Sequence, residues 1–120
     1  MLPEIITPKV CRDNPDILFV FGDNLLNRGK RGQAIIRDEP NAWGIPTKRV
    51  PSMSSGSFFT GTRDEWQAVD FALDLLDIRA KNYKKVHIPK AGLGTGLAKL
   101  NENCPDIFNY IKERVSIYEN

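Results

Sequence analysis

One apolar stretch constrains the fold of this chain more than any other. The segment "DILFVFGDN" carries an unbroken apolar run over residues 17–21, followed by Gly22, Asp23 and Asn24. An apolar run without alternation is typical of a strand buried on both faces, and a Gly-Asp-Asn end is typical of a turn. The sequence therefore predicts a central strand whose carboxyl end carries polar side chains.

Helical patterns alternate with strand patterns along the rest of the chain. Thr62 and Glu65 form a capping-box pattern, which predicts a helix that starts at Thr62. Apolar residues follow at helical spacing and predict one buried face: Trp66, Val69, Leu73, Leu76 and Ala80. A last helix is predicted from about Asn103, with Pro105 in its first turn.

The remaining segments complete an α/β pattern. We expect a helix in "QAIIRDE" and short strands in "WGIPTK", "SFFTG" and "KKVHIPK". Strands that alternate with helices predict a layered α/β fold around a central sheet. The length of 120 residues fits a single domain over residues 1–120.

Composition bears on the partners, the cellular location and the metal content expected of this protein. The net charge of +2 neither demands nor excludes a nucleic-acid partner. No apolar run approaches the roughly 20 residues of a membrane span, and no signal peptide is evident, so we expect a cytoplasmic protein without a membrane partner. With Cys11, Cys104 and His87 as the only soft ligands, we expect reduced cysteines, no metal and no cofactor.

Three loops that follow predicted strands carry the candidate site residues, because ligands bind beyond the carboxyl ends of strands in open α/β sheets. The first is "GDNLLNRGKRGQA", in which Gly29 and Gly32 permit a close backbone approach to a ligand. Its cations, Arg28, Lys30 and Arg31, can equally be solvated side chains of a flexible turn.

The second loop is "AGLGTGLAK", with Gly92, Gly94 and Gly96 at alternate positions. Successive backbone N–H groups in such a loop can form an anion nest, and Thr95 adds a hydroxyl donor. The loop matches neither a P-loop nor a dinucleotide fingerprint.

The third segment is "GIPTKR". Pro46 stiffens the backbone that leads to Thr47 and Lys48. Lys48 is either a solvated strand-end cation or an amine delivered into a site. Desolvated beside a second cation such as Arg49, an amine would have a lowered pKa and become a nucleophile or base.

Taken together, the three segments resemble the macrodomain family, which binds ADP-ribose in a crevice above a central mixed sheet. "ILFVFGDNLLNRGKRGQAI" is similar to the first family motif, with Asn24 at the strand-end asparagine position, and "VHIPKAGLGTGL" is similar to the diphosphate loop. The "GIPTKR" segment resembles the terminal ADP-ribose glycohydrolase branch, which includes antitoxins that remove ADP-ribose from DNA. The resemblance implies a three-layer fold.

The resemblance also implies roles for residues. Lys48 falls on the catalytic lysine of that branch, Asn24 would bind the distal ribose, and Asp23 would orient a water molecule or Lys48, or else form a turn. The residues expected to contact the ligand are Gly22, Gly29, Gly32, Gln33, Ala34, Thr47, Gly92, Gly94, Thr95, Gly96 and Leu97. Ala98 stands near the position where protein-directed members carry a catalytic Asp.

The hypothesis is therefore an ADP-ribosyl hydrolase that acts on modified DNA or protein. Two alternatives remain at this stage. One is a non-catalytic binder of ADP-ribose or a related NAD-derived nucleotide. The other is a nucleic-acid-binding protein whose basic patch contains Arg28, Lys30, Arg31, Arg37, Lys48 and Arg49.

Overall fold

The apolar run lies at the middle of a three-stranded sheet. In this computed structural model, which describes residues 1–119, β1 (Ile17–Asn24) pairs with β2 (Ala42–Lys48) on one side and with β3 (Lys85–His87) on the other. Both pairings are parallel. The predicted α/β class is confirmed, and a strand at the predicted place occupies the centre of the sheet.

Side chains of β1 alternate between two hydrophobic clusters. Leu18 and Val20 belong to the larger cluster on one face of the sheet, whereas Phe19 and Phe21 belong to a smaller cluster on the other. All four side chains are buried. A strand covered on both faces needs apolar residues at every position, and this explains why the run shows no alternation.

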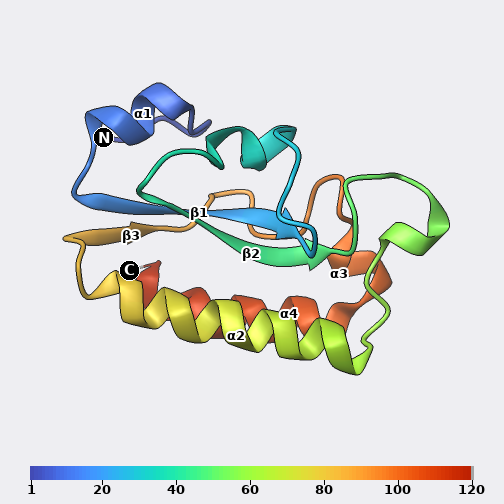
Figure 1. Ribbon diagram of the computed structural model, residues 1–120. Coiled ribbons are helices and arrows are strands. Elements are labelled where there is room, and N and C mark those ends of the chain that lie inside the picture. The colour runs from blue at the N-terminus through green and yellow to red at the C-terminus, as the bar shows by residue number, and fades with distance from the viewer. Residues whose placement is uncertain (120) are drawn as a thin grey trace.

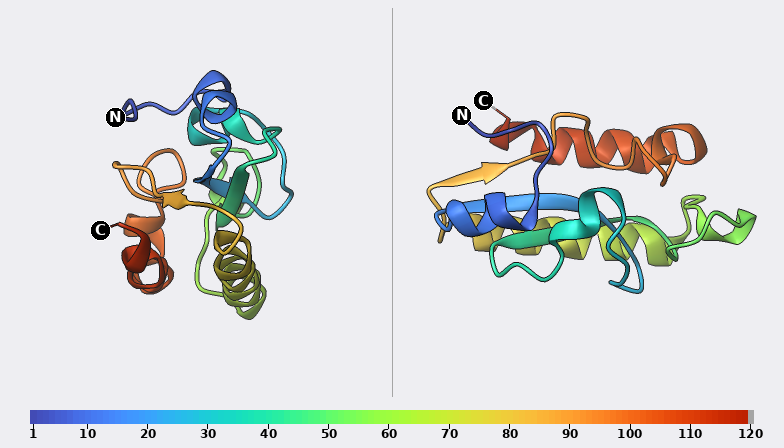
Figure 2. Two further views of the ribbon diagram at one scale, coloured as in Figure 1. Left: turned by 90° about the vertical axis from the view of Figure 1, so that its left-hand side faces the viewer. Right: turned by 90° about the horizontal axis from the view of Figure 1, so that it is seen from above.

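Helices cover both faces of the sheet. Figure 1 shows α1 (Pro8–Asp13) and the 3₁₀ helix η1 (Gly32–Ile36) above the strands, with α2 (Arg63–Ala80) and α4 (Pro105–Val115) below them. The two views of Figure 2 show α2 and α4 side by side on the lower face. The larger cluster fills the space between these two helices and the sheet.

The predicted start of α2 is confirmed in detail. Thr62 is the N-cap, and the Thr62 and Glu65 side chains form the capping box. Val69, Leu73 and Leu76 are buried on the sheet side, as their spacing predicts. Local capping and the apolar stripe agree here, so the sequence alone was sufficient.

Several short elements differ from the prediction. The segment "QAIIRDE" contributes to the short 3₁₀ helix η1 and does not form a longer α-helix. The segment "SFFTG" forms no strand, and its Phe58 makes only an isolated antiparallel bridge with Lys48. The last helix is preceded by a separate short turn of helix. The remaining elements are η2 (Ser55–Ser57), α3 (Leu100–Asn103) and η3 (Ser116–Tyr118).

The sheet is parallel where the resemblance implies a mixed one. Within residues 1–119, the three strands pair only in parallel.

No helix in that part of the chain is long and apolar enough to cross a membrane. Cys11 and Cys104 are free thiols and both are buried, as expected of cysteines in a core.

Candidate functional site

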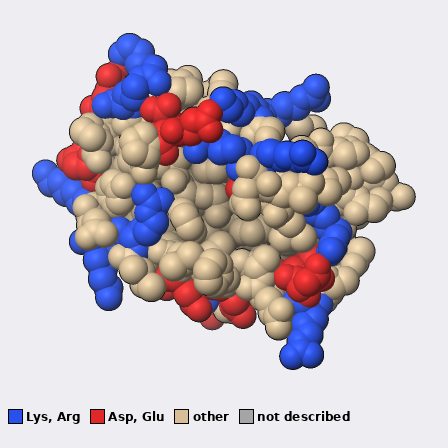
Figure 3. Space-filling model, in the orientation of Figure 1, with Lys and Arg blue, Asp and Glu red and all other residues tan. Residues whose placement is uncertain are grey.

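A cavity of about 430 Å³ opens where β1 and β2 end. Three segments line it: the end of β1 with its following loop, the end of β2, and the glycine loop after β3. Figure 3 shows Lys and Arg side chains gathered over the loop that follows β1. The predicted site residues that line the cavity are Gly22, Asp23, Asn24, Gly29, Gly32, Gln33, Ala34, Thr47, Lys48, Gly94, Gly96 and Leu97.

A β-bulge places Lys48 at this cavity. Asp23 pairs with Pro46, but Asn24 pairs with Lys48, so Thr47 is an extra residue in β2. The Thr47 hydroxyl donates to the Asp23 carbonyl at 3.2 Å. Bulges redirect the side chains that follow them, and Pro46 is tolerated because β2 is an edge strand. Lys48 lines the cavity as a result, with 8% of its surface exposed.

The Lys48 amine has no acidic partner among residues 1–119. Its Nζ lies 3.3 Å from the Met53 Sδ and 5.2 Å from the centre of the Phe58 ring. Burial lowers the pKa of the Lys48 amine below its ordinary value. A larger share of this amine is therefore neutral near physiological pH than in an exposed lysine.

The neighbouring cation does not contribute to this pKa shift. Arg49 turns toward the start of α2, where its Nη1 lies 2.5 Å from the Glu65 Oε2 and its Nη2 lies 2.7 Å from the Asp64 Oδ2. The expectation that Arg49 depresses the pKa of Lys48 is wrong, because burial alone accounts for the shift.

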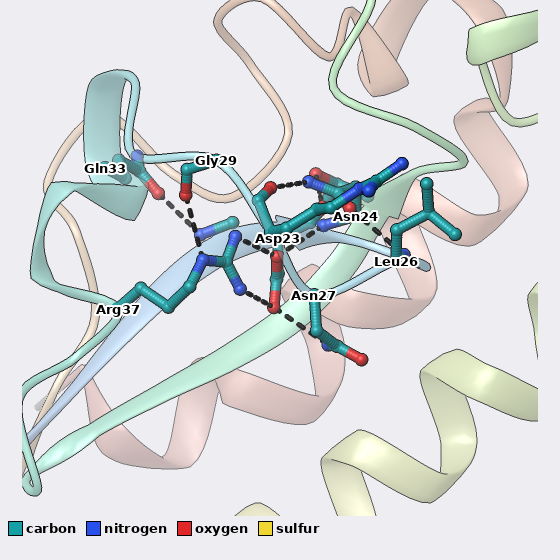
Figure 4. A network of polar contacts seen from close by, with 10 residues as sticks. Asp23, Asn24, Leu26, Asn27, Gly29, Gln33 and Arg37 are labelled. Atoms are coloured by element: carbon teal, nitrogen blue, oxygen red, sulfur yellow. Dashed lines mark hydrogen bonds and ion pairs between the residues drawn. The ribbon is translucent and has the colours of Figure 1, made fainter.

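The Asp23 carboxylate accepts hydrogen bonds from several protein donors (Figure 4). Arg37 donates to both oxygens, at 2.9 and 2.6 Å, the Asn24 backbone N–H donates at 2.7 Å, and the Asn27 amide donates at 3.1 Å. A carboxylate offers about four acceptor sites, so these four donors saturate it. The arrangement favours a structural role for Asp23 over the predicted role in orienting a water molecule or Lys48.

Asn24 shapes the first loop. Its Oδ1 accepts from the Leu26 N–H at 3.0 Å, and its Nδ2 donates to the Arg28 carbonyl at 2.7 Å (Figure 4). These two bonds form an Asx-type turn directly after β1. One amide hydrogen of Asn24 has no acceptor in the described chain and remains available to a ligand at the cavity.

Gln33 joins two of the three segments. Its Oε1 accepts from the Gly22 N–H, and its Nε2 donates to the Gly92 carbonyl, both at 2.9 Å. A Cβ at Gly22 would lie 3.4 Å from the Gln33 Oε1, at the near edge of ordinary van der Waals contact. Gln33 lines the cavity, and its amide also holds the two loops together. Its contact with a ligand stays a prediction.

The glycine loop after β3 offers backbone donors. The N–H groups of residues 94–97 have no acceptor in the described part of the chain. Gly94 has φ of +83°, and a Cβ there would lie 2.7 Å from the Leu100 Cβ, so only glycine fits. Gly92 and Thr95 lie outside the cavity lining, and the Thr95 hydroxyl donates to the Ala91 carbonyl at 2.7 Å.

The first loop faces the glycine loop with donors and cations. The N–H groups of residues 28–33 also have no acceptor within residues 1–119. Arg28 and Arg31 line the cavity without a described ion pair, whereas Lys30 pairs with Asp38. With Asp23 neutralised by Arg37, the cavity wall is positive and suits a ligand with several negative charges.

Sequence reasoning missed Met53 and Pro51, and it placed Arg37 in a basic patch without its ion pair to Asp23. A buried aspartate requires a cationic partner, and this requirement was the available signal for Arg37. Met53 and Pro51 lie in an exposed, serine-rich segment that carries no periodic pattern, so nothing in the sequence connected them with Lys48. The described residues contain no group of three or more His, Cys, Asp or Glu that could hold a metal ion.

Comparison with known proteins identifies the family but no activity. A family model described as a family of unknown function, DUF7831, matches residues 1–114. The chain belongs to this family. Searches of curated proteins and of solved structures find no match. The chemistry of the cavity must therefore be argued from its own residues.

Proposed function

We propose that this member of the DUF7831 family binds ADP-ribose in the cavity at the ends of β1 and β2, and removes it from a modified nucleic-acid base or protein side chain. The observation that carries the proposal is the buried amine of Lys48, which lines the same cavity as two loops. Within residues 1–119 this amine has no acidic partner, and the backbone N–H groups of the loops have no acceptor. Such a combination suits an anionic substrate with an electrophilic carbon.

The backbone loops would hold the diphosphate. Gly94, Gly96, Leu97 and residues 28–33 line the same cavity and have backbone N–H groups without an acceptor in residues 1–119, and Arg28 and Arg31 add positive charge at its wall. Backbone donors and cations are the usual ligands of phosphate oxygens. The cavity volume of about 430 Å³ also falls within the range of nucleotide-sized ligand sites.

Lys48 would act at the distal ribose. In its neutral form the amine carries a lone pair that can attack C1, while the bond from C1 to the base or side chain breaks and the leaving group takes the electron pair and a proton. Water then attacks C1, the bond between C1 and Nζ breaks, and ADP-ribose and the free amine are released. In its charged form the same amine can donate a proton to that leaving group. Burial lowers the pKa of this amine, which makes its neutral form more abundant than in an exposed lysine.

The macrodomain resemblance supports this proposal through its motifs. The order of the strand-end Asn24, the Lys48 segment and the glycine loop agrees with the family, and all three meet at one cavity. The parallel three-stranded sheet is simpler than the mixed sheet of that family. For this reason the macrodomain-like fold is part of the proposal, and the cavity is its main support.

The test is hydrolysis by the wild-type protein and by Lys48→Arg. ADP-ribosylated DNA and ADP-ribosylated protein are incubated with each, and released ADP-ribose is measured by mass spectrometry. We expect Lys48→Arg to lose about a hundredfold or more in rate, because arginine keeps the charge but supplies no lone pair. Cleavage at the wild-type rate by Lys48→Arg would remove Lys48 from the chemistry.

A matched control uses Lys9→Arg. Lys9 lies on α1, is exposed and pairs with Asp13, so this variant changes a lysine outside the cavity. We expect it to cleave like the wild type. Calorimetric titration with ADP-ribose completes the test, because absence of binding by the folded wild type would contradict the whole proposal.

A second candidate is a non-catalytic binder of ADP-ribose or a related NAD-derived nucleotide. The specific observation in its favour is the saturated carboxylate of Asp23, since the cavity lining contains no other carboxylate that could activate water. Calorimetric binding without release of ADP-ribose from any substrate would select this candidate.

The structure weakens the third candidate, a basic nucleic-acid-binding surface. Arg37 is paired with Asp23, Arg49 with Glu65, and Lys30 with Asp38. The six cations therefore do not form one free patch, and an ion pair leaves little charge for a phosphate backbone. DNA affinity that falls steeply with salt in the absence of ADP-ribose would restore this candidate.

A further inference from the structure

Within residues 1–119, no oxygen acceptor contacts the Lys48 amine. Among the described residues, the contacts of its Nζ are the Met53 Sδ at 3.3 Å and the Phe58 ring at 5.2 Å. A thioether sulfur is a weak acceptor, and an aromatic face stabilises an ammonium only modestly when water remains nearby. The identity of the atom at the Met53 position therefore decides how well the charged amine is accommodated.

Met53 is accessible from solvent although it touches a buried amine. Its exposed fraction is 51%, and the flanking residues 51–56 are all exposed. A solvent-accessible thioether is open to oxidation by hydroperoxides. The two cysteines are poor competitors, because Cys11 is 0% exposed and Cys104 is 5% exposed.

Oxidation at Met53 would replace the weak acceptor by a strong one. The sulfoxide carries an oxygen on the same sulfur that already faces the Nζ. A hydrogen bond to this oxygen favours the ammonium form and raises the pKa of the amine, opposing the effect of burial. The lone pair needed for attack on a carbon is then occupied by a proton.

We propose that Met53 is a reversible oxidation site through which hydroperoxides convert Lys48 from a reactive amine to a hydrogen-bonded ammonium. The sulfur donates an electron pair to the hydroperoxide, the O–O bond breaks, and one oxygen stays on sulfur while the hydroperoxide leaves as an alcohol or water. Two thiols reverse the step, forming a disulfide and water and restoring the thioether.

The amine can be observed directly, without a substrate. The protein is treated with hydrogen peroxide until peptide mass spectrometry shows Met53 sulfoxide, and then labelled with trace acetic anhydride. Acetylation of Lys48 is compared with that of Lys9 and Lys81, which are exposed and far from Met53 in the chain. We expect Lys48 labelling to fall about fivefold to tenfold, the effect of a rise of up to one pKa unit, and the two reference lysines to be unaffected.

Two variants separate oxidation at Met53 from other damage. Met53→Leu keeps an apolar side chain that cannot be oxidised, so its Lys48 labelling should be the same before and after peroxide. Met53→Gln supplies an amide oxygen and should show reduced Lys48 labelling without peroxide. Met1, the other methionine, is exposed and serves as an internal marker of the extent of oxidation.

The outcomes decide the inference independently of catalysis. Unchanged Lys48 labelling after complete oxidation of Met53 in folded protein would overturn it, as would a peroxide effect of the same size in Met53→Leu. The consequence for turnover rests on the proposed function, but the labelling does not. If Met53 oxidation silences Lys48 labelling while ADP-ribose neither binds nor is released, the proposed function fails and the oxidation site stands.

Discussion

Lys48 and Arg49 are neighbours in the chain, yet their side chains end in opposite surroundings. Arg49 lies between the carboxylates of Asp64 and Glu65, which raise the pKa of its guanidinium well above its usual range. Lys48 lies against a thioether and an aromatic ring, and burial lowers the pKa of its amine. Arg49 is neutralised by two carboxylates, whereas Lys48 has no acidic partner within residues 1–119.

At the end of β2, Arg49 stabilises the fold through ion pairs, whereas the adjacent Lys48 lines the cavity. Arg49 connects the end of β2 to the start of α2 through its bond to Glu65. Glu65 also accepts the N–H groups of residues 60–62 at 2.7 to 3.0 Å, so the segment before α2 is fixed at the same carboxylate. The backbone on one side of Lys48 is thereby held by charge. The amine itself is placed by the bulge at Thr47, without a counter-ion that would stabilise its protonated form.

The largest expected effect comes from removing the buried carboxylate on the Arg49 side. Glu65 is 0% exposed, and Glu65→Ala leaves three backbone N–H groups and Arg49 without their shared acceptor. We expect a loss of about 3 to 5 kcal/mol in the free energy of unfolding, measured by urea denaturation. A loss below about 1 kcal/mol would show that water replaces Glu65 and that the comparison is overstated.

On the Lys48 side, an apolar substitution should have the opposite sign. Lys48→Met removes a buried charge that lacks an acidic partner while keeping much of the side-chain shape. We expect it to stabilise the protein by about 1 kcal/mol. Lys48→Arg, whose guanidinium cannot lose its charge, should be less stable than Lys48→Met in the same urea experiment. A destabilised Lys48→Met would mean that the amine is well accommodated when charged.

The pH dependence of stability tests whether the Lys48 amine is disfavoured in its charged form. The folded protein lowers the pKa of Lys48 below its ordinary value of 10.5, so between the two values the unfolded chain binds more protons at this site. Stability contributed by this group therefore rises with pH across that interval. We expect the stability advantage of Lys48→Met over the wild type to shrink as the pH approaches 10.5. An advantage independent of pH would show that packing, not charge, explains it.

The smallest effect is expected for the exposed partner of Arg49. Asp64→Asn removes one ion pair at the surface but leaves the Glu65 contacts in place. Surface pairs contribute little, so we expect a change in unfolding free energy far below that of Glu65→Ala. This variant is also the matched control for Glu65, and equal losses in the two would contradict the distinction between exposed and buried partners.

Local patterns predicted the elements that depend on local physics. The apolar run of residues 17–21 predicted a buried strand, and Thr62 with Glu65 predicted the start of α2. Tertiary contacts overrode the pattern elsewhere. "QAIIRDE" has helical composition, but Arg37 at its end is drawn toward Asp23, and only a short 3₁₀ helix forms.

The candidate site was predicted as a set of segments and not as a geometry. Strand ends in parallel order bring the three loops to one edge, so most predicted residues line the cavity. The hydrogen-bond partners of Gln33 and Asp23 were not predicted, because they include groups distant in sequence. Such partners leave no periodic signal.

The sequence by itself determined that a central strand would end in polar residues, that three loops would gather beyond it, and that a stiff segment would lead to Lys48. These features follow from hydrophobic pattern, capping and turn chemistry, which act over a few residues. Only the tertiary structure decided that Lys48 would have no acidic partner among residues 1–119 while Arg49 and Asp23 were neutralised. A register shift of one residue at Thr47 and ion pairs across the fold set that outcome, and both depend on how distant segments meet.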